Sequence, residues 1–234
     1  MVCISENSRE KELQYIDLLY SHRVLGIVVC SHIGETMEHL DSNCPLISFE
    51  REIAENIPAV LCDNYQGGIL AANRLFDAGC RNIAIFNPPT KENIPAYSRE
   101  KAFMKCCEDK KISGRVVYTD RLAPLSEEFG NNILELLKKN SDLDGIFATS
   151  DVMAANIIRA CKKMGKRVPE DISIVGFDDT WISTLTYPSI TTIHQPVQEM
   201  CEYAIEAIVK KVKSEKVPSQ VVFPVELIDR ESTK

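Results

Sequence analysis

The sequence predicts an α/β protein built on a doubly wound parallel sheet, or on two such sheets. Short apolar runs rich in β-branched residues alternate along the chain with segments whose apolar residues recur at helical spacing. Several of the apolar runs end directly at an acidic residue, which is typical of buried strands whose carboxyl ends open into a cleft. A chain of 234 residues is long enough for one or two units of this kind.

The first part of the chain alternates between extended and helical patterns. The predicted order is strand 1–5, helix 10–22, strand 24–30, helix 34–40, strand 45–49 and strand 59–62. The helix at 10–22 rests on apolar residues three and four positions apart. The run at 24–30 is too short and too rich in branched residues to favour a helix. The last two strands end at Glu50 and Asp63.

The middle of the chain continues the alternation. The predicted order is helix 65–78, strand 82–86, helix 98–110, strand 116–118 and helix 126–139. Gly79 supplies the left-handed residue that ends the first of these helices. Ser98 is expected to cap the second helix, and Arg99 lies in its first turn, where a cation opposes the helix dipole. An arginine in that place is either solvated or meets an anionic or hydroxylated group.

The last part of the chain contains the central strand. The predicted order is strand 145–149, a helix that begins at Ser150 and Asp151 and carries apolar residues to Met164, strand 172–177, strand 190–195, helix 197–212, and strands 220–223 and 225–228. The strand at 172–177 stops abruptly at Asp178 and Asp179, where a parallel sheet holds its ligand chemistry. The alternative interpretation is that this acidic pair caps a turn or the next helix.

Acids follow strand after strand in this pattern. Each of them alone could be a cap, but five on one rim favour a polar binding cleft. The five are Glu50, Asp63, Asp120, Asp151 and Asp178.

Composition and charge restrict the class of protein. With 44% hydrophobic and 26% charged residues, the chain is an ordinary globular sequence. Nine cysteines lie scattered without a Cys-x-x-Cys pair, which indicates small buried hydrophobes in a reducing cytosol rather than disulfides or a zinc site. The beginning of the sequence lacks a secretory pattern and no run reaches membrane-spanning length, so we expect a cytoplasmic protein. A net charge of −7 predicts that this chain alone does not bind DNA.

The common catalytic and cofactor motifs are missing from the sequence. There is no dinucleotide fingerprint, phosphate-binding P-loop or nucleophile elbow, and the four histidines lack metal-ligand spacing. The sequence therefore predicts no catalytic residue, no metal and no cofactor. Gly67 and Gly68 near a helix start either cradle a phosphate or allow close packing of the helix.

Six motifs, in order over nearly the whole chain, carry a family resemblance. They are VLCDNYQGG (60–68), RLFDAGCRNIA (74–84), ATSDVMA (148–154), VPEDISIVGFDD (168–179), PSITTIHQP (188–196) and LIDREST (227–233). This set resembles the effector-binding core of the lactose-repressor (LacI/GalR) family of bacterial transcription regulators. The resemblance implies the type I periplasmic-binding-protein-like fold, in which two parallel-sheet lobes are joined by crossover strands and hold an effector between them.

The resemblance also implies domain boundaries and ligand-binding positions. The N-lobe would comprise residues 1–62 and 195–224, and the C-lobe residues 63–194 and 225–234. The residues that fall on the family's effector-binding positions are Glu50, Arg99, Ser150, Asp151, Asp178 and Gln195, with Leu125 at a position that is aromatic in some relatives. Carboxylates that accept from hydroxyls and an arginine that donates a planar fork suit a polyol. Trp181 is expected either to stack on a sugar face or to pack.

The resemblance implies the sensing and dimerising core of a DNA-binding regulator of carbohydrate genes. The expected partners are a small-molecule effector, for which a sugar is expected, and a second copy of the chain. No membrane partner is expected. The alternative is the solute-binding protein of a sugar transporter, which has the same fold, but the missing secretory pattern and the nine free cysteines count against it. An enzyme on a doubly wound fold is a second alternative without a catalytic constellation.

Two departures from the family pattern are expected to matter. The helix-turn-helix that contacts DNA in the family is absent from this sequence. We therefore expect DNA binding only in a longer protein that includes a helix-turn-helix. The first strand and helix of the N-lobe are also absent, and residues 1–5 resemble the second strand. Because the first strand is central in this sheet order, we expect exchanged segments, oligomers or low stability unless that unit is supplied.

Overall fold

The computed structural model describes residues 1–5, 8–30, 44–89, 94–123 and 125–234, and these residues form two compact units. The first unit consists of Met1–Cys62 with Pro196–Phe223, and the second of Asp63–Gln195 with Pro224–Lys234. The chain therefore passes between the units three times. Gln195 and Pro224 belong to the second unit, whereas the family resemblance assigns both to the N-lobe.

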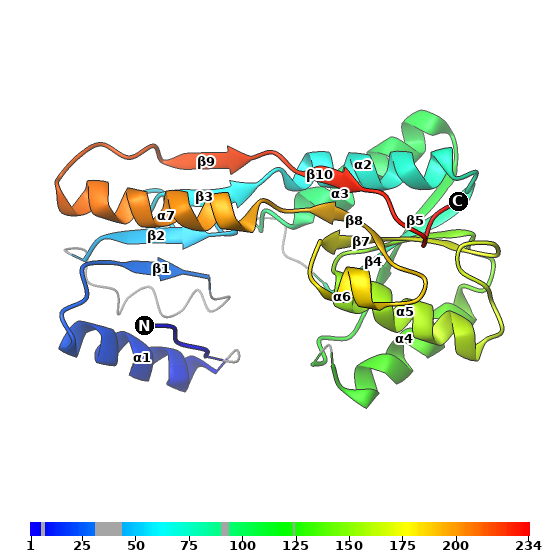
Figure 1. Cartoon of the computed structure of the whole chain (residues 1–234), viewed down its shortest axis with the longest axis horizontal. Coiled ribbons are helices and arrows are strands. Elements are labelled where there is room, and N and C mark those ends of the chain that lie inside the picture. The colour runs from blue at the N-terminus through cyan, green and yellow to red at the C-terminus, as the bar shows by residue number, and fades with distance from the viewer. Residues whose placement is uncertain (6–7, 31–43, 90–93, 124) are drawn as a thin grey trace. The chain divides into compact units, whose positions relative to one another are not determined.

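The first unit is built on a parallel sheet of four strands (Figure 1). The strand order is β1 (Ile27–Val29), β2 (Leu46–Phe49), β3 (Ala59–Cys62) and β9 (Gln220–Phe223). Helix α7 (Val197–Val212) packs on β1, β2 and β3, and buries Met200, Ala204 and Ile208. Helix α1 (Arg9–Ser21) contributes Leu19 to the apolar cluster around Ile27 and Leu46.

The second unit is built on a sheet of six strands. Its order is β10 (Glu226–Ile228), β8 (Thr191–His194), β7 (Ser173–Asp178), β6 (Gly145–Ala148), β4 (Asn82–Asn87) and β5 (Ser113–Tyr118). All neighbours run parallel except β10, which is antiparallel to β8. The fold class expected from the sequence, α/β with doubly wound parallel sheets, is confirmed.

Five helices complete the second unit in the residues that the structure describes. They are α2 (Asn64–Asp77), α3 (Tyr97–Lys110), α4 (Glu127–Lys139), α5 (Asp151–Lys163) and α6 (Ile182–Leu185). Helices α2 and α3 pack on each other, as do α4 and α5, and Figure 1 shows the two pairs on opposite faces of the sheet. In the core on the α3 side, Phe103 stacks on Phe147, and the Phe147 ring packs at a tilt against Phe177. The core on the other side includes Phe86, Ile133 and Ile157.

Local sequence signals account for most element boundaries. Gly79 and Gly165 follow helices α2 and α5 and have φ angles of 88° and 71°. A left-handed residue commonly ends a helix, and glycine adopts this conformation without strain. Ser126 and Ser150 cap α4 and α5 by accepting hydrogen bonds from the backbone N–H groups of Phe129 and Met153. The predicted stop at Gly79 and the predicted helix starts at Ser126 and Ser150 are confirmed.

Several element predictions are wrong. Residues 1–5 form no strand, and Met1, Val2 and Ile4 are exposed. The strand predicted at 24–30 is limited to β1. The predicted cap Ser98 lies inside α3, whose N-cap is Ala96, and its hydroxyl donates to the Pro95 carbonyl over 2.5 Å.

Two further outcomes complete the comparison of elements. The short helix α6 was absent from the sequence prediction, because four residues are too few for a helical period to be visible. The helix predicted at 34–40 lies outside the described residues.

Candidate ligand site

The second unit contains a topological switch point. The chain leaves β4 to form β5 on one side of it and returns to form β6 on the other side. Helices α3 and α5, which follow β4 and β6, therefore depart over opposite faces of the sheet. Ligands of open α/β sheets bind in the crevice that such a divergence leaves outside the carboxyl ends of the strands. Arg99 lies in the first turn of α3 and Ser150 is the N-cap of α5, so this crevice is where both residues lie.

The Arg99 side chain is buried, with only 8% of the residue's surface exposed, and neighbouring groups hold its guanidinium in place. Its Nε donates to Asn64 Oδ1 over 2.5 Å, and its Nη1 donates to the Thr149 carbonyl over 3.2 Å. The guanidinium carbon lies 3.5 Å from the centre of the Phe177 ring, which is a cation–π contact. A cation in the first turn of a helix is locally unfavourable, and these contacts from three other elements explain how the fold retains it.

A polar network extends from Arg99 across the carboxyl ends of three strands. Thr149 at the end of β6 donates to Asn87 Oδ1, and Asn87 at the end of β4 donates to the buried carboxylate of Glu100. Tyr118 at the end of β5 donates to the same carboxylate over 3.0 Å. This hydrogen bond to Glu100 raises the pKa of Tyr118. The sequence prediction missed Asn64, Asn87 and Glu100; Asn64 and Asn87 share one visible signal, since each is a polar residue within two positions of a strand end.

Asp151 is completely buried, and protein donors occupy both of its carboxylate oxygens. Thr192 Oγ1 donates to Oδ1 over 2.6 Å, while the backbone N–H and the hydroxyl of Thr180 donate to Oδ2. Burial raises the pKa of Asp151, and the hydrogen bonds from Thr192 and Thr180 oppose that shift. The expectation that Asp151 contacts a ligand directly does not fit this burial. Its position instead ties α5 to β8 and to the turn after β7.

Asp178 and Asp179 end β7 with an unusual backbone. Their φ angles are 101° and 56°, in a region that costs a residue other than glycine about 1 to 3 kcal/mol. Strain of this kind is typical of ligand sites, because only a firm surrounding structure retains it. The Asp178 carboxylate accepts a hydrogen bond of 2.6 Å from Nε2 of Gln195, so these two predicted site residues lie together.

Asp179 has a structural role beside Asp178. Arg230 Nη2 lies 2.6 Å from its Oδ1, and His194 Nδ1 lies 3.0 Å from its Oδ2. Burial alone would raise the pKa of Asp179, but the hydrogen bonds and charges of Arg230 and His194 outweigh it, and the pKa is lower than usual. Arg230 belongs to the terminal segment after β10, so Asp179 fastens that segment to the end of β7.

Trp181 and Leu125 are both exposed side chains. Trp181 is 71% exposed before α6, and Leu125 is 86% exposed before α4. Leu185 and Tyr187, which follow Trp181 closely in sequence, are also exposed, at 73% and 92%. The structure therefore gives Trp181 no packing role in the core.

Glu50 belongs to the first unit and follows β2. Its φ is 55°, and its Oε1 accepts a hydrogen bond of 2.5 Å from the backbone N–H of Cys62 at the end of β3. Glu50 therefore lies at the carboxyl edge of its own sheet, the edge at which parallel sheets bind ligands.

The expectation of five acids on one rim is wrong. Glu50 lies on the sheet of the first unit, while Asp120, Asp151 and Asp178 follow strands of the second unit. Asp63 caps α2 by accepting from the backbone N–H of Gln66 over 2.8 Å. Asp120 accepts from Asn132 Nδ2. Asp63 is therefore a helix cap, a common role for an acidic residue at the start of a helix.

The glycine pair at the start of α2 packs closely. A Cβ on Gly67 would lie 2.7 Å from the Phe177 ring, and a Cβ on Gly68 would lie 2.3 Å from the Arg99 carbonyl oxygen. Of the two interpretations of Gly67 and Gly68, these distances support close packing of the helix. Gly67 packs against β7, and Gly68 packs against α3.

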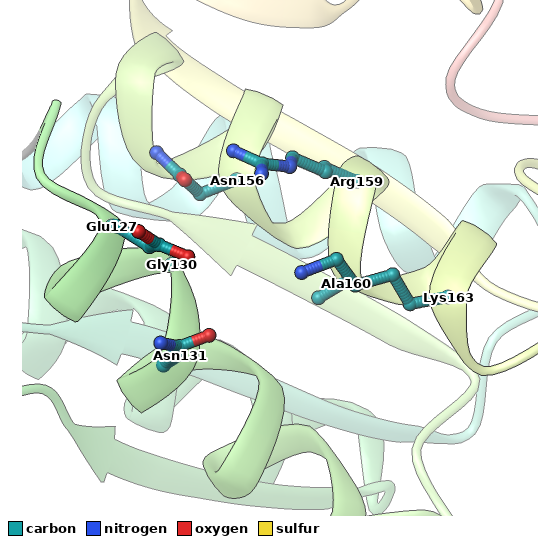
Figure 2. A pocket seen from close by; sticks show the side chains of 7 residues that line it. All are labelled: Glu127, Gly130, Asn131, Asn156, Arg159, Ala160 and Lys163. Carbon is teal, nitrogen blue, oxygen red and sulfur yellow. The ribbon is translucent and has the colours of Figure 1, made fainter.

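A shallow hollow lies between α4 and α5 on the face of the second unit (Figure 2). Its lining residues are Glu127, Gly130, Asn131, Asn156, Arg159, Ala160 and Lys163. It contains none of the predicted site residues and carries charges of both signs, so it offers no preference for one class of ligand. Among the described residues, histidine, cysteine and acidic side chains form no group of three that would hold a metal ion.

Comparison with known proteins identifies the family. Residues 72–233 match the periplasmic binding protein-like domain. All of the chain aligns, at 31% identity, with 70% of the ribose operon repressor of Halalkalibacterium halodurans. The chain is also similar to a periplasmic binding protein/LacI transcriptional regulator from Alkaliphilus metalliredigens, whose crystal structure contains D-xylulofuranose. The two sequences are 32% identical, and the superposition covers all of this chain and 87% of the other with a TM-score of 0.86. The chain belongs to the LacI family.

Further regulators that resemble this chain agree with this assignment. The sucrose operon repressor of Lactococcus lactis is 28% identical over 97% of this chain and 70% of its own length. The complex of the transcriptional regulator CelR with cellobiose is 25% identical, covers 96% of this chain and 71% of its own, and has a TM-score of 0.84. The LacI-family core and its periplasmic-binding-protein-like fold are thus established for this chain. In the parts that the structure describes, no helix combines the length and apolar character needed to cross a bilayer.

Proposed function

We propose that this LacI-family core senses a sugar and, in an intact regulator, controls carbohydrate genes. The support comes from relatives named as ribose and sucrose operon repressors and from similar regulators whose structures contain D-xylulofuranose or cellobiose. Those names describe repressors, which favours a regulator over the solute-binding protein of a transporter. They also support a protein that is cytoplasmic and is not an enzyme. This chain carries a net charge of −7, so DNA would be contacted by a separate segment.

The observation that carries the proposal is the geometry of Arg99 at the switch point of the second unit. Its guanidinium is oriented by Asn64, Thr149 and Phe177 at the edge where such sheets bind ligands. In the same unit, Asp178 supplies a carboxylate, Gln195 an amide and Ser150 a hydroxyl. An arginine fork with carboxylate and amide groups matches the alternating donors and acceptors of a polyol.

The proposed ligand contacts are therefore Arg99, Ser150, Asp178 and Gln195 of the second unit. Glu50 of the first unit, together with the exposed Leu125 and Trp181, completes the proposed set. Asp151 supports these contacts from the interior rather than touching the ligand. Carboxylates in the set would repel phosphate, so a neutral sugar is proposed over a sugar phosphate.

A ligand panel tests the proposal. The purified chain is melted with pentoses, hexoses, disaccharides, sugar phosphates and purines at millimolar concentration. A ligand at one hundred times its dissociation constant adds about 2.7 kcal/mol to stability, which raises the melting temperature by several degrees. One class of neutral sugar is expected to produce this shift, and isothermal titration then gives its Kd.

Replacing Arg99 by Ala is expected to weaken binding of that sugar by about 10-fold to 150-fold, since hydrogen bonds from a charged donor contribute about 1.5 to 3 kcal/mol. The matched control is Arg159→Ala, an exposed arginine on α5, which should leave the Kd unchanged. A chain that melts cooperatively but responds to no sugar, or an Arg99→Ala variant with unchanged Kd, would contradict the proposal.

The chain is also proposed to form a homodimer. Leu185 and Tyr187 expose large apolar side chains two positions apart in the second unit. Apolar groups gathered in this way are typical of protein interfaces. Leu185→Asp is expected to convert a dimer into a monomer in sedimentation equilibrium at micromolar concentration, because a charge would be buried in the interface. Leu25→Asp, which changes a residue that is 74% exposed in the first unit, is the control. A wild-type chain that sediments as a monomer would refute dimerisation.

A further inference from the structure

We infer that the start of α2, through Asn64, Gly67 and Gly68, positions the Arg99 guanidinium and thereby sets which sugar hydroxyls it recognises. The consequence for recognition rests on the proposed function. The positioning itself rests on contacts within the second unit, and these three residues fall outside every set of ligand contacts proposed above. They account for a glycine pair that the sequence singled out without a role.

Asn64 fixes the plane of the guanidinium. It is the first residue of α2, follows directly after the cap Asp63, and is only 3% exposed. Its Oδ1 accepts from Arg99 Nε over 2.5 Å. Because the guanidinium is planar, a partner at Nε restricts the direction in which both terminal nitrogens point. The carbonyl of Thr149 takes a further hydrogen bond from Nη1, so the plane is defined at two points.

Gly67 makes room for the ring that supports the guanidinium. The Phe177 ring lies beneath Arg99 at 3.5 Å, and a Cβ on Gly67 would approach Cε2 of that ring to 2.7 Å. Real Cβ atoms do not tolerate that distance, so the ring would have to move. Phe177 is completely buried beside Phe147, which limits where it could go.

Gly68 sets the height of Arg99 relative to α2. A Cβ on Gly68 would lie 2.3 Å from the Arg99 carbonyl oxygen and 3.0 Å from the Ala102 Cβ. Glycine at this position therefore allows α3 to pack directly on α2. At this separation the Arg99 side chain reaches Asn64.

A guanidinium fixed in this way favours one arrangement of ligand oxygens. Binding then requires little ordering of the arginine, and oxygens outside its plane are rejected. Loosening the arginine should weaken binding of the preferred sugar more than binding of its stereoisomers. The expected signature is a smaller ratio between the Kd values of two epimers.

The first test needs no ligand. The arginine Nε–Hε signals are recorded by 15N NMR, and the Arg99 signal is assigned through its loss in Arg99→Lys. In the wild-type chain this proton should exchange slowly and be shifted by the ring current of Phe177. In Asn64→Ala we expect at least 10-fold faster exchange and a changed shift, whereas Asn64→Asp, which keeps the acceptor oxygen, should restore slow exchange. Asn132→Ala, a change of the same kind at an asparagine that contacts Asp120, should have no effect.

The second test uses the sugar that the ligand panel identifies and one of its epimers. Asn64→Ala should raise the Kd of the preferred sugar about 10-fold and reduce the ratio between the epimers about 3-fold, and Asn64→Asp should recover both. A wild-type chain that binds no sugar would overturn the proposed function, and the NMR result alone would then decide the positioning. An unchanged Nε–Hε signal in Asn64→Ala, or an unchanged Kd and epimer ratio, would overturn the inference even where sugar binding is confirmed.

Discussion

Replacing Asp151 by Ala is expected to lower the free energy of unfolding by about 3 to 5 kcal/mol, a loss that would shift the melting temperature by roughly 6 to 20 °C. The carboxylate is fully buried and accepts hydrogen bonds from Thr192 and from two groups of Thr180. Alanine leaves three donors without a partner in the interior. The backbone N–H of Thr180 cannot turn away, so its desolvation cost remains in full.

The measurement is urea unfolding at pH 7 followed by circular dichroism. Asp120→Ala is the matched control, because Asp120 is exposed and bonds only at the surface, and it should cost no more than about 0.5 kcal/mol. Asp151→Asn should fall between the two variants, since one acceptor oxygen is kept and an amide donor faces the threonines. A loss below about 1 kcal/mol in Asp151→Ala would show that the donors find other partners.

The second large effect is expected for Gly68→Ala. The new Cβ would lie 2.3 Å from a backbone oxygen of α3, so the two helices must separate or one must shift. Overpacking of this kind costs about 1 to 3 kcal/mol, and here a backbone atom rather than a flexible side chain is displaced. The cost should therefore lie at the upper end of that range. Because alanine is the better helix former by about 1 kcal/mol, we expect a net loss of about 2 kcal/mol in urea unfolding.

Gly130→Ala separates the two contributions. Gly130 lies in α4 beside the hollow shown in Figure 2, and its nearest neighbour is Asn156 Oδ1, 3.4 Å from a built Cβ. The same substitution should therefore stabilise the chain there by about 0.5 to 1 kcal/mol. Opposite signs for the two variants would confirm that helix packing decides the result. Stabilisation in both would mean that α2 and α3 can move apart at little cost.

The elements were predictable where local chemistry decides them. Helix α7 and the strands β3 and β9 have the bounds that the sequence predicts, because a helical period or a short branched run is bounded by a proline or an acid. The predicted strand at residues 1–5 failed, since apolar residues form a strand only beside a partner, and none of the described residues pairs with them. Ser98 failed as a cap because α3 begins one residue before it.

The candidate site was predictable only in part. The family resemblance pointed to Arg99, Asp178 and Gln195, and the last two prove to be joined by a hydrogen bond. Asn64 carried one local signal, its place two residues after β3, but its bond to Arg99 joins residues 35 positions apart and could not be read from the sequence. The burial of Asp151 was hidden for a similar reason. It depends on Gly176, where a Cβ would lie 2.5 Å from Oδ1, and on threonines from two later segments.

The three passages of the chain between the units have a consequence for synthesis on the ribosome. Cys62 in β3 pairs with Phe223 in β9, a residue that is made 161 positions later. The nascent first unit therefore leaves the ribosome with one edge of its sheet open while the whole of residues 63–195 is translated. Exposed strand edges of this kind are prone to wrong pairing during folding. The speed of translation through the second unit then becomes a determinant of yield, and slower elongation over residues 63–195 should lengthen the period at risk.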